Sequence, residues 1–213
     1  MADDAVWTED QPRAATVLGR VMLLVALAVG ILALGALVSR DVSPGGGLAC
    51  SFGALGMLVV QFFGGERFSL DRVATIWLLV VAALIGLGLG PVLEYYGDVD
   101  PAAITGAAAA TAVVFAAVGG CGLILGRDLA RWTAPISLGL MGLIGVSLVR
   151  VLFGGAGSRL LNVAIGGVSA LLILVDFNFR RHRPTEHVPI LATGIAVAVV
   201  NLFVSLLSLL GEG

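Results

Sequence analysis

The sequence predicts an all-α polytopic membrane protein that crosses the bilayer seven times. Hydrophobic residues make up 59% of the 213 residues and charged residues only 12%, with a mean hydropathy of +1.06, far from the composition of soluble proteins. The apolar residues also gather into seven runs of about 20, the length that a helix needs to cross ~30 Å of hydrocarbon. No soluble domain is expected.

Each predicted span is an apolar run that ends at arginine, acidic, proline or glycine residues. The spans cover about residues 17–38, 46–64, 73–93, 103–126, 132–153, 159–178 and 188–210. They end, in order, before Arg40, at Gly64, near Pro91, before Arg127, before Gly154, before Arg180 and at Gly211. Residues 1–16 are then an acidic tail, and residues 17–213 form one membrane domain.

The arginines predict the orientation in the membrane, because basic residues are retained on the cytoplasmic side. Seven spans place nine of the twelve arginines on the side of the N-terminal tail: Arg13, Arg20, Arg67, Arg72, Arg127, Arg131, Arg180, Arg181 and Arg183. The other side holds Arg40, Arg150 and Arg159. We therefore expect a cytoplasmic N-terminus and an external C-terminus, most naturally in the plasma (inner) membrane.

The composition also excludes two classes of protein. The chain has no lysine, so a Schiff-base mechanism, including that of a retinal protein, lacks its amine. A net charge of −2 and a pI near 5.6 provide no basic surface for nucleic acid.

Many of the 30 glycines lie inside the predicted spans, where small residues let helices approach closely in lipid. We expect this packing role for Gly86, Gly88, Gly90, Gly119, Gly120, Gly122, Gly166 and Gly167.

Asp176 is the charged residue predicted to lie deepest within a span. It follows the apolar run 170–175, about three residues inside the end of the sixth span. A carboxyl group at that depth has to pair with a cation, take up a proton or contact water. Two interpretations stay open: a helix-end acid that pairs with Arg180 one turn later, or a functional group in a cavity.

Small and polar residues form a stripe on each of the last two spans. At helical spacing before Asp176, the sixth span carries Ser169, Gly166 and Asn162. The stripe on the seventh span consists of Gly194, Ala198, Asn201, Ser205 and Ser208. One stripe alone is more typical of helix packing, but two on consecutive helices favour a polar cavity. The pore-lining candidates are Asn162, Ser169, Ala198, Asn201 and Ser205.

Three features of the C-terminal region occur together in one known family. Asp176 closes the sixth span, a basic hairpin begins at Arg180, and Asn201-Leu202-Phe203 lies in the last span. In these features the stretch from Asn162 onward resembles the C-terminal third of the Bax inhibitor-1 family, also called the transmembrane Bax inhibitor motif family. The segments 86–91 and 126–129, the length and the seven spans agree with that family.

The resemblance implies a fold of six helices around a central C-terminal seventh. In the bacterial calcium-leak branch it also implies a pH-sensitive cation conduit, in which two aspartates share a proton and an arginine after span two holds the closed state. Asp176 matches the first aspartate, whereas the position of the second, three residues before Asn201, is Ala198. For the arginine the candidate is Arg67, with Arg72 as runner-up.

The loss of the second aspartate changes the expected chemistry. With a single carboxylate beside an arginine, we expect pH sensing that is weak or shifted to acidic pH. Calcium prefers about six to eight oxygen ligands, so we expect Asp176 to bind this metal only weakly and transiently. Glu94, Asp98 and Asp100, assigned to the loop after span three, are interpreted as solvated loop acids, with attraction of cations to the outer mouth as the alternative.

Three functions stay open. The first is a passive cation leak, for calcium, gated near Asp176. The alternatives are a non-conducting regulator that binds another membrane protein, such as a protease, and a small-solute permease. An enzyme is not expected, because His182 and His187 both lie between spans six and seven, away from any intramembrane serine. No cofactor is expected beyond transient calcium, and the expected partners are the lipid bilayer, cations and, for the regulator, a membrane protein.

Overall fold

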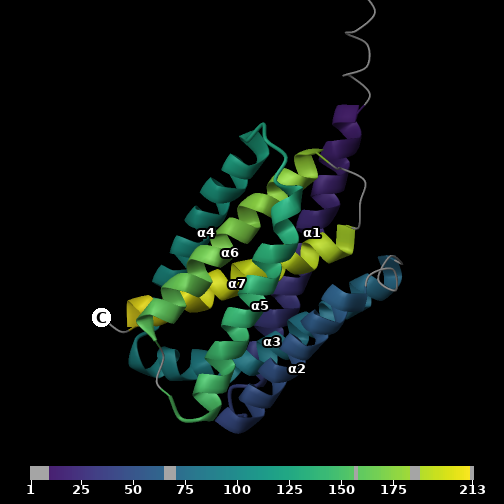
Figure 1. The fold of residues 1–213 in the computed structure, drawn as a ribbon. Helices are drawn as coiled ribbons and strands as arrows, with labels where there is room; N and C mark the ends of the chain where they lie inside the picture. Colours follow the sequence, from purple (N-terminus) through teal and green to yellow (C-terminus); the bar gives the residue numbers. More distant parts are fainter. Residues whose placement is uncertain (1–9, 65–70, 156–157, 183–187, 212–213) are drawn as a thin grey trace, which may run out of the picture.

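Seven helices account for nearly all of the described chain (Figure 1). The computed structural model describes residues 10–64, 71–155, 158–182 and 188–211. The helices are α1 (Asp10–Val38), α2 (Pro44–Gly64), α3 (Asp71–Val99), α4 (Pro101–Ile124), α5 (Ala130–Leu152), α6 (Arg159–His182) and α7 (Val188–Gly211). Each of the seven is long and apolar enough to cross a membrane, so the predicted fold class is confirmed.

α7 is the central helix of the bundle. Ala196, Val197 and Ala198, which are consecutive and therefore about 100° apart around the helix, are each at most 8% exposed. α7 contacts α1, α3, α4 and α6, and it crosses behind α5 and α6 at a steep angle in Figure 1. A largely apolar helix has to be enclosed; here these four helices pack along α7, and α2 and α5 reach it through Leu58 and Met141, which cluster with Val197. The expected arrangement of six helices around a C-terminal seventh is confirmed.

Glycines allow close contacts between pairs of helices. A Cβ atom at Gly86 of α3 would overlap the backbone of Leu32 in α1, and one at Gly122 of α4 would overlap the backbone of α6. The structure therefore agrees with the packing role predicted for these two residues. By contrast, a Cβ atom at Gly120 or Gly167 would meet no atom within 4 Å, so these two glycines do not have the role predicted for them.

α3 is longer than the sequence predicted. The span expected to end near residue 93 continues to Val99, and Pro91 lies inside the helix. Proline removes one helical hydrogen bond, but the Pro91 ring packs against Gly47 of α2, and Tyr96 packs into an apolar cluster with Leu207 of α7. These contacts outweigh the local tendency of the helix to end.

The longer α3 corrects the positions of the acids assigned to the following loop. Glu94 and Asp98 lie on the last turns of α3 and are exposed. Asp100 is the N-cap of α4, where its side chain accepts a hydrogen bond from the backbone N–H of Ala103 at 3.2 Å. One of the three acids therefore has a structural role that the sequence analysis did not assign.

Asn178 of α6 holds the connection between α4 and α5. Its side-chain amide donates to the carbonyl oxygens of Gly122 at 3.3 Å and Leu125 at 3.0 Å, and its Oδ1 accepts from the backbone N–H of Leu129 at 2.9 Å. These partners are backbone groups at the end of one helix and the start of the next, which have no partner within their own helices. One buried amide thus joins both helix ends to α6, two residues from Asp176.

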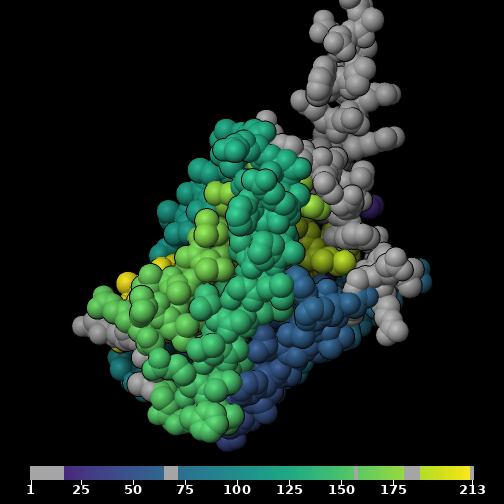
Figure 2. All heavy atoms as spheres, viewed as in Figure 1, coloured from purple at the N-terminus to yellow at the C-terminus, as the bar shows by residue number. Residues whose placement is uncertain are grey.

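α2 and α5 lie close together at one end of the bundle and separate toward the other (Figure 1). Near the middle, Leu55 of α2 lies 3.7 Å from the place that a Cβ of Gly145 in α5 would occupy. Where the two helices separate, the yellow-green surface of α7 is visible between them in Figure 2. This separation gives access to the region around Asp176.

Candidate functional site

Asp176 lies inside the protein, against the central helix. Its side chain is 2% exposed, and a Cβ atom at Gly194 of α7 would be only 2.9 Å from its Oδ2. Any side chain at position 194 would therefore crowd the carboxyl group. The next residue, Phe177, packs against Gly119 of α4 instead, so Asp176 and Phe177 contact different neighbours of α6.

The carboxyl group of Asp176 lines a cavity of about 410 Å³, here called the Asp176 chamber. The chamber lies between the end of α2, the start of α5, the end of α6 and the start of α7. Its lining residues are Leu58, Gln61, Phe62, Ala130, Thr133, Ala134, Ser137, Met141, Asp176, Phe179, Ile190, Leu191, Thr193 and Gly194. Most of the wall is apolar, and the polar groups are few.

Three polar atoms of this wall are buried and have no hydrogen-bond partner within the described residues: Gln61 Oε1, Thr133 Oγ1 and Asp176 Oδ2. A buried polar atom left unpaired costs about 1–3 kcal/mol. Native proteins satisfy such atoms with water or a bound group. That three of them, from α2, α5 and α6, meet in one chamber indicates a space that accommodates water or a polar solute.

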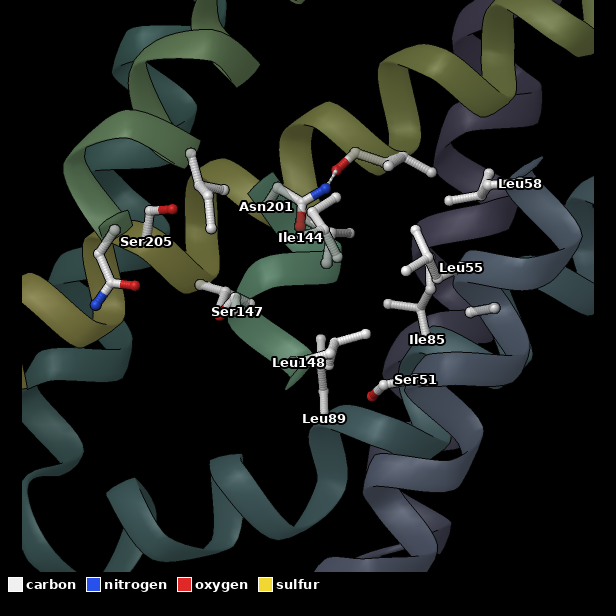
Figure 3. A pocket seen from close by; sticks show the side chains of 16 residues that line it. Ser51, Leu55, Leu58, Ile85, Leu89, Ile144, Ser147, Leu148, Asn201 and Ser205 are labelled. Atoms are coloured by element: carbon white, nitrogen blue, oxygen red, sulfur yellow. Dashed lines mark hydrogen bonds between the residues drawn. The ribbon is translucent and has the colours of Figure 1, made fainter. Parts of the chain in front are cut away.

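A second, smaller cavity of about 160 Å³ lies farther along α7 and is here called the Asn201 chamber. Figure 3 shows Asn201, Ser205 and Ser147 around it, opposite apolar side chains of α2 and α3. Asn201 Nδ2 donates to the carbonyl oxygen of Val197 at 2.9 Å. Asn162 of α6 also lines this chamber. Ser51 of α2 lines it as well, so amide and hydroxyl groups from four helices surround this chamber.

An apolar barrier separates the two chambers. Leu58 of α2 lines both of them and is 9% exposed. It packs with Val197, which lines the Asn201 chamber, and with Met141, which lines the Asp176 chamber. We call Leu58, Val197 and Met141 the Leu58 barrier. Apolar constrictions of this kind exclude water and ions until they widen.

The structure places the predicted site residues at different points of this arrangement. Asn162, Asn201 and Ser205 line the Asn201 chamber, and Asp176 lines the other. Ser169 and Ala198 are fully buried and line neither of the two chambers.

The arginine predicted to hold the closed state is not located, because Arg67 lies outside the described residues. Its runner-up, Arg72, is exposed at the start of α3. The side chain of Arg180, the other expected partner of Asp176, also lies outside the described part. The pairing of Asp176 with an arginine therefore stays a prediction.

The polar residues Gln61, Thr133 and Ser137 of the Asp176 chamber were not predicted from the sequence, and neither was the contact of Gly194 with the carboxyl group. Gln61 was detectable, because an amide within an apolar run such as 57–63 is a polar group that needs a partner inside the membrane. Thr133 and Ser137 are four residues apart and share one face of α5, a weaker signal. The sequence pattern contains nothing that pairs Gly194 with Asp176.

Fold and site together define a polytopic α-helical membrane protein with two internal chambers, each lined by a few polar groups, beside an enclosed last helix. The chain matches the family model described as "Inhibitor of apoptosis-promoting Bax1" over residues 14–213. It therefore belongs to the Bax inhibitor-1 family, as the resemblance of its C-terminal region indicated.

Two similar proteins come from bacteria. The chain is 29% identical over 197 residues to an uncharacterized membrane protein of Vibrio cholerae, covering 89% of this chain and 85% of the relative. It is 27% identical over 163 residues to an uncharacterized protein of Pseudomonas aeruginosa, covering 73% of each. The similarity thus extends over most of the membrane domain and agrees with a family of membrane proteins.

Proposed function

We propose that this protein is a passive cation leak, with calcium as the cation and Asp176 as its pH-sensitive gating group. The observation that carries the proposal is the meeting of Gln61 Oε1, Thr133 Oγ1 and Asp176 Oδ2, buried and unpaired among the described residues, in one chamber. Such oxygens interact favourably with water and with a hard cation.

The position of the two chambers supports a route across the bundle. Both lie along α7, between α2, α5 and α6, and the Leu58 barrier separates them. The described state is then closed. Widening the barrier, for example by a movement of α2 relative to α7, joins the chambers. A route closed by a few apolar side chains fits a slow leak better than an open channel.

The ligand set supports transient binding only. Asp176 is the one carboxylate among the residues that line the two chambers, and the other oxygens come from amides and hydroxyl groups. Within the described residues, no three histidine, cysteine, aspartate or glutamate side chains come together as metal ligands. Conduction needs binding weak enough for the ion to leave, and one carboxylate with neutral oxygens satisfies that condition.

Asp176 is also the group through which pH acts. Its charge changes on protonation, and a carboxylate without a partner is unfavourable in a largely apolar wall. An arginine after α2, with Arg67 as the candidate, stabilises the charged form in the closed state. The distribution of arginines supports a cytoplasmic position for this end of the chamber and for the N-terminus, in the plasma (inner) membrane.

Calcium flux into vesicles tests the proposal. Purified full-length protein is reconstituted into vesicles that contain a calcium-sensitive dye, and entry is measured between about pH 5 and 8. We expect flux above that of empty vesicles, with a change of at most about tenfold that falls at the acidic end of this range, the size of effect that one pK unit of differential interaction produces. Asp176→Asn should make the profile flat, because the side chain can no longer change its charge.

The control is Asp98→Asn, which removes an exposed acid at the end of α3 and should leave the pH profile unchanged. If Asp176→Asn behaves as the unchanged protein does, the assignment of the gating group is wrong. If no flux exceeds that of empty vesicles at any pH, the leak is wrong, and a non-conducting regulator that binds another membrane protein becomes the better explanation.

A further inference from the structure

A third cavity adjoins the Asp176 chamber at the surface of the bundle. It has a volume of about 640 Å³ and is lined by Arg127, Asp128, Ala130, Arg131 and Phe179; we call it the basic vestibule. Ala130 and Phe179 also line the Asp176 chamber, so the two spaces share a wall. The proposed leak gives this vestibule no role, and its two arginines oppose the entry of cations.

The vestibule carries two positively charged side chains on a connection that hydrogen bonds hold in position. Arg127 and Arg131 are both exposed, and the acid beside them, Asp128, uses its Oδ1 to accept a hydrogen bond from the backbone N–H of Ala130 at 2.8 Å. The start of α5 adds the positive end of a helix dipole. The amide of Asn178 holds this connection against α6 through the N–H of Leu129. An anion would therefore meet two arginines that extend from a backbone that the fold holds in place.

The depth of the vestibule agrees with the level of lipid headgroups. Trp132 is exposed beside it, and the guanidinium carbon of Arg131 lies 5.7 Å from the centroid of the Trp132 ring. Tryptophan and arginine are typical of the boundary between membrane and water. Basic pockets between transmembrane helices at this level bind the headgroups of anionic lipids.

The neighbouring chamber has an apolar wall suited to a hydrocarbon chain. Phe62 of α2, Ala134 and Met141 of α5 and Ile190 of α7 belong to that wall. In Figure 2 the gap between α2 and α5 leaves α7 visible from outside the bundle, so a chain can enter sideways from the bilayer. The volume of about 410 Å³ lies within the usual range of pockets for small ligands.

We propose that the basic vestibule and the Asp176 chamber together bind one anionic phospholipid. The phosphate contacts Arg127 and Arg131, and one acyl chain lies between α2 and α5 and extends toward Asp176. The bound headgroup neutralises the two arginines, and the chain displaces water from the chamber. This binding does not depend on whether the protein conducts ions, and in a leak it keeps the route closed.

Lipid binding to the delipidated full-length protein tests this site. Native mass spectrometry in detergent, with added phosphatidylglycerol or phosphatidylcholine, counts the bound lipids. We expect one phosphatidylglycerol to bind more tightly than any phosphatidylcholine. The double variant Arg127→Gln, Arg131→Gln should weaken it on the order of thirtyfold, from about 1 kcal/mol for each basic residue near an anionic surface. The matched control is Arg40→Gln, Arg159→Gln, which removes two exposed arginines at the opposite end of the helices and should change nothing.

Two further experiments distinguish a bound lipid from a bound free phosphate and test the position of the acyl chain. Soluble glycerol phosphate should not compete at a concentration equal to that of the lipid, because it lacks the acyl chain. Ala134→Trp should fill the chamber and reduce binding while the two arginines are present. Equal binding of both lipids, equal loss in the control double variant, or full binding in Ala134→Trp would each show that the site is wrong. The lipid-binding experiment does not involve ion flux, so its outcome is independent of the proposed leak.

Discussion

Replacing Gly86 by alanine is expected to destabilise the protein by about 3 kcal/mol, because the added methyl group has no space. Gly86 of α3 lies against α1, where a Cβ atom would overlap the carbonyl oxygen of Leu32 and come within 2.9 Å of its Cα and carbonyl carbon. Backbone atoms cannot rotate away as a side chain can. The two helices have to separate, and the dispersion contacts along their length weaken.

Thermal unfolding in detergent measures this effect. For a chain of this length, a loss of about 3 kcal/mol corresponds to a fall in Tm of about 6–12 °C. The matched control is Gly142→Ala in the interior of α5, where a Cβ atom meets no atom within 4 Å. There alanine should leave the stability unchanged or raise it by up to about 1 kcal/mol, since it favours the helix. Equal Tm values for the two variants would contradict the close contact between α1 and α3.

Replacing Leu58 by asparagine is expected to raise the calcium flux about tenfold or more. Leu58 lines both chambers and packs with Val197 and Met141, so it occupies the apolar barrier between them. An amide of similar size allows water into the barrier and lowers the free energy of an ion there. A reduction of about 1.4 kcal/mol is enough for the tenfold increase.

Leu55→Asn is the control, because Leu55 lies on the same helix and lines the Asn201 chamber but not the Asp176 chamber. Leu55→Asn makes the same leucine-to-asparagine change outside the Leu58 barrier. The calcium flux through this variant should therefore stay near that of the unchanged protein. Leu58→Phe should lower the flux by making the barrier bulkier. If Leu58→Asn and Leu55→Asn raise the flux equally, Leu58 does not form the barrier, and the leak follows another route.

The number of helices and most of their ends were predictable from composition and the length of apolar runs. A membrane requires its spanning segments to satisfy their own backbone hydrogen bonds, so each long apolar run becomes a helix with little influence from its neighbours. Two ends differ clearly: α1 begins at Asp10, within the segment predicted to be a tail, and α3 continues through Pro91 to Val99. Its last turns pack on α7 through Tyr96, and this contact is long-range.

The candidate site was predictable only in part. Asp176 was identified by its depth in the membrane, and Asn162, Asn201 and Ser205 by helical spacing, and these four residues do line the chambers. The same spacing also selected Ser169 and Ala198, which line neither chamber. Spacing shows which residues share a face of one helix, but not which neighbouring helix covers that face.

The class of protein, the seven spans, the family and the charged residue on which a function can depend were all accessible from the amino-acid sequence. The class, the spans and Asp176 follow from local composition, because lipid excludes charge and unpaired backbone groups, whereas the family follows from the resemblance of the C-terminal motifs. Only the folded bundle shows that Gln61 of α2 and Thr133 of α5 line the same chamber as Asp176. It also shows that the carboxyl group lies against Gly194 and that Leu58 lines both chambers. These contacts join helices far apart in the chain, and they depend on the angles at which small residues let those helices cross.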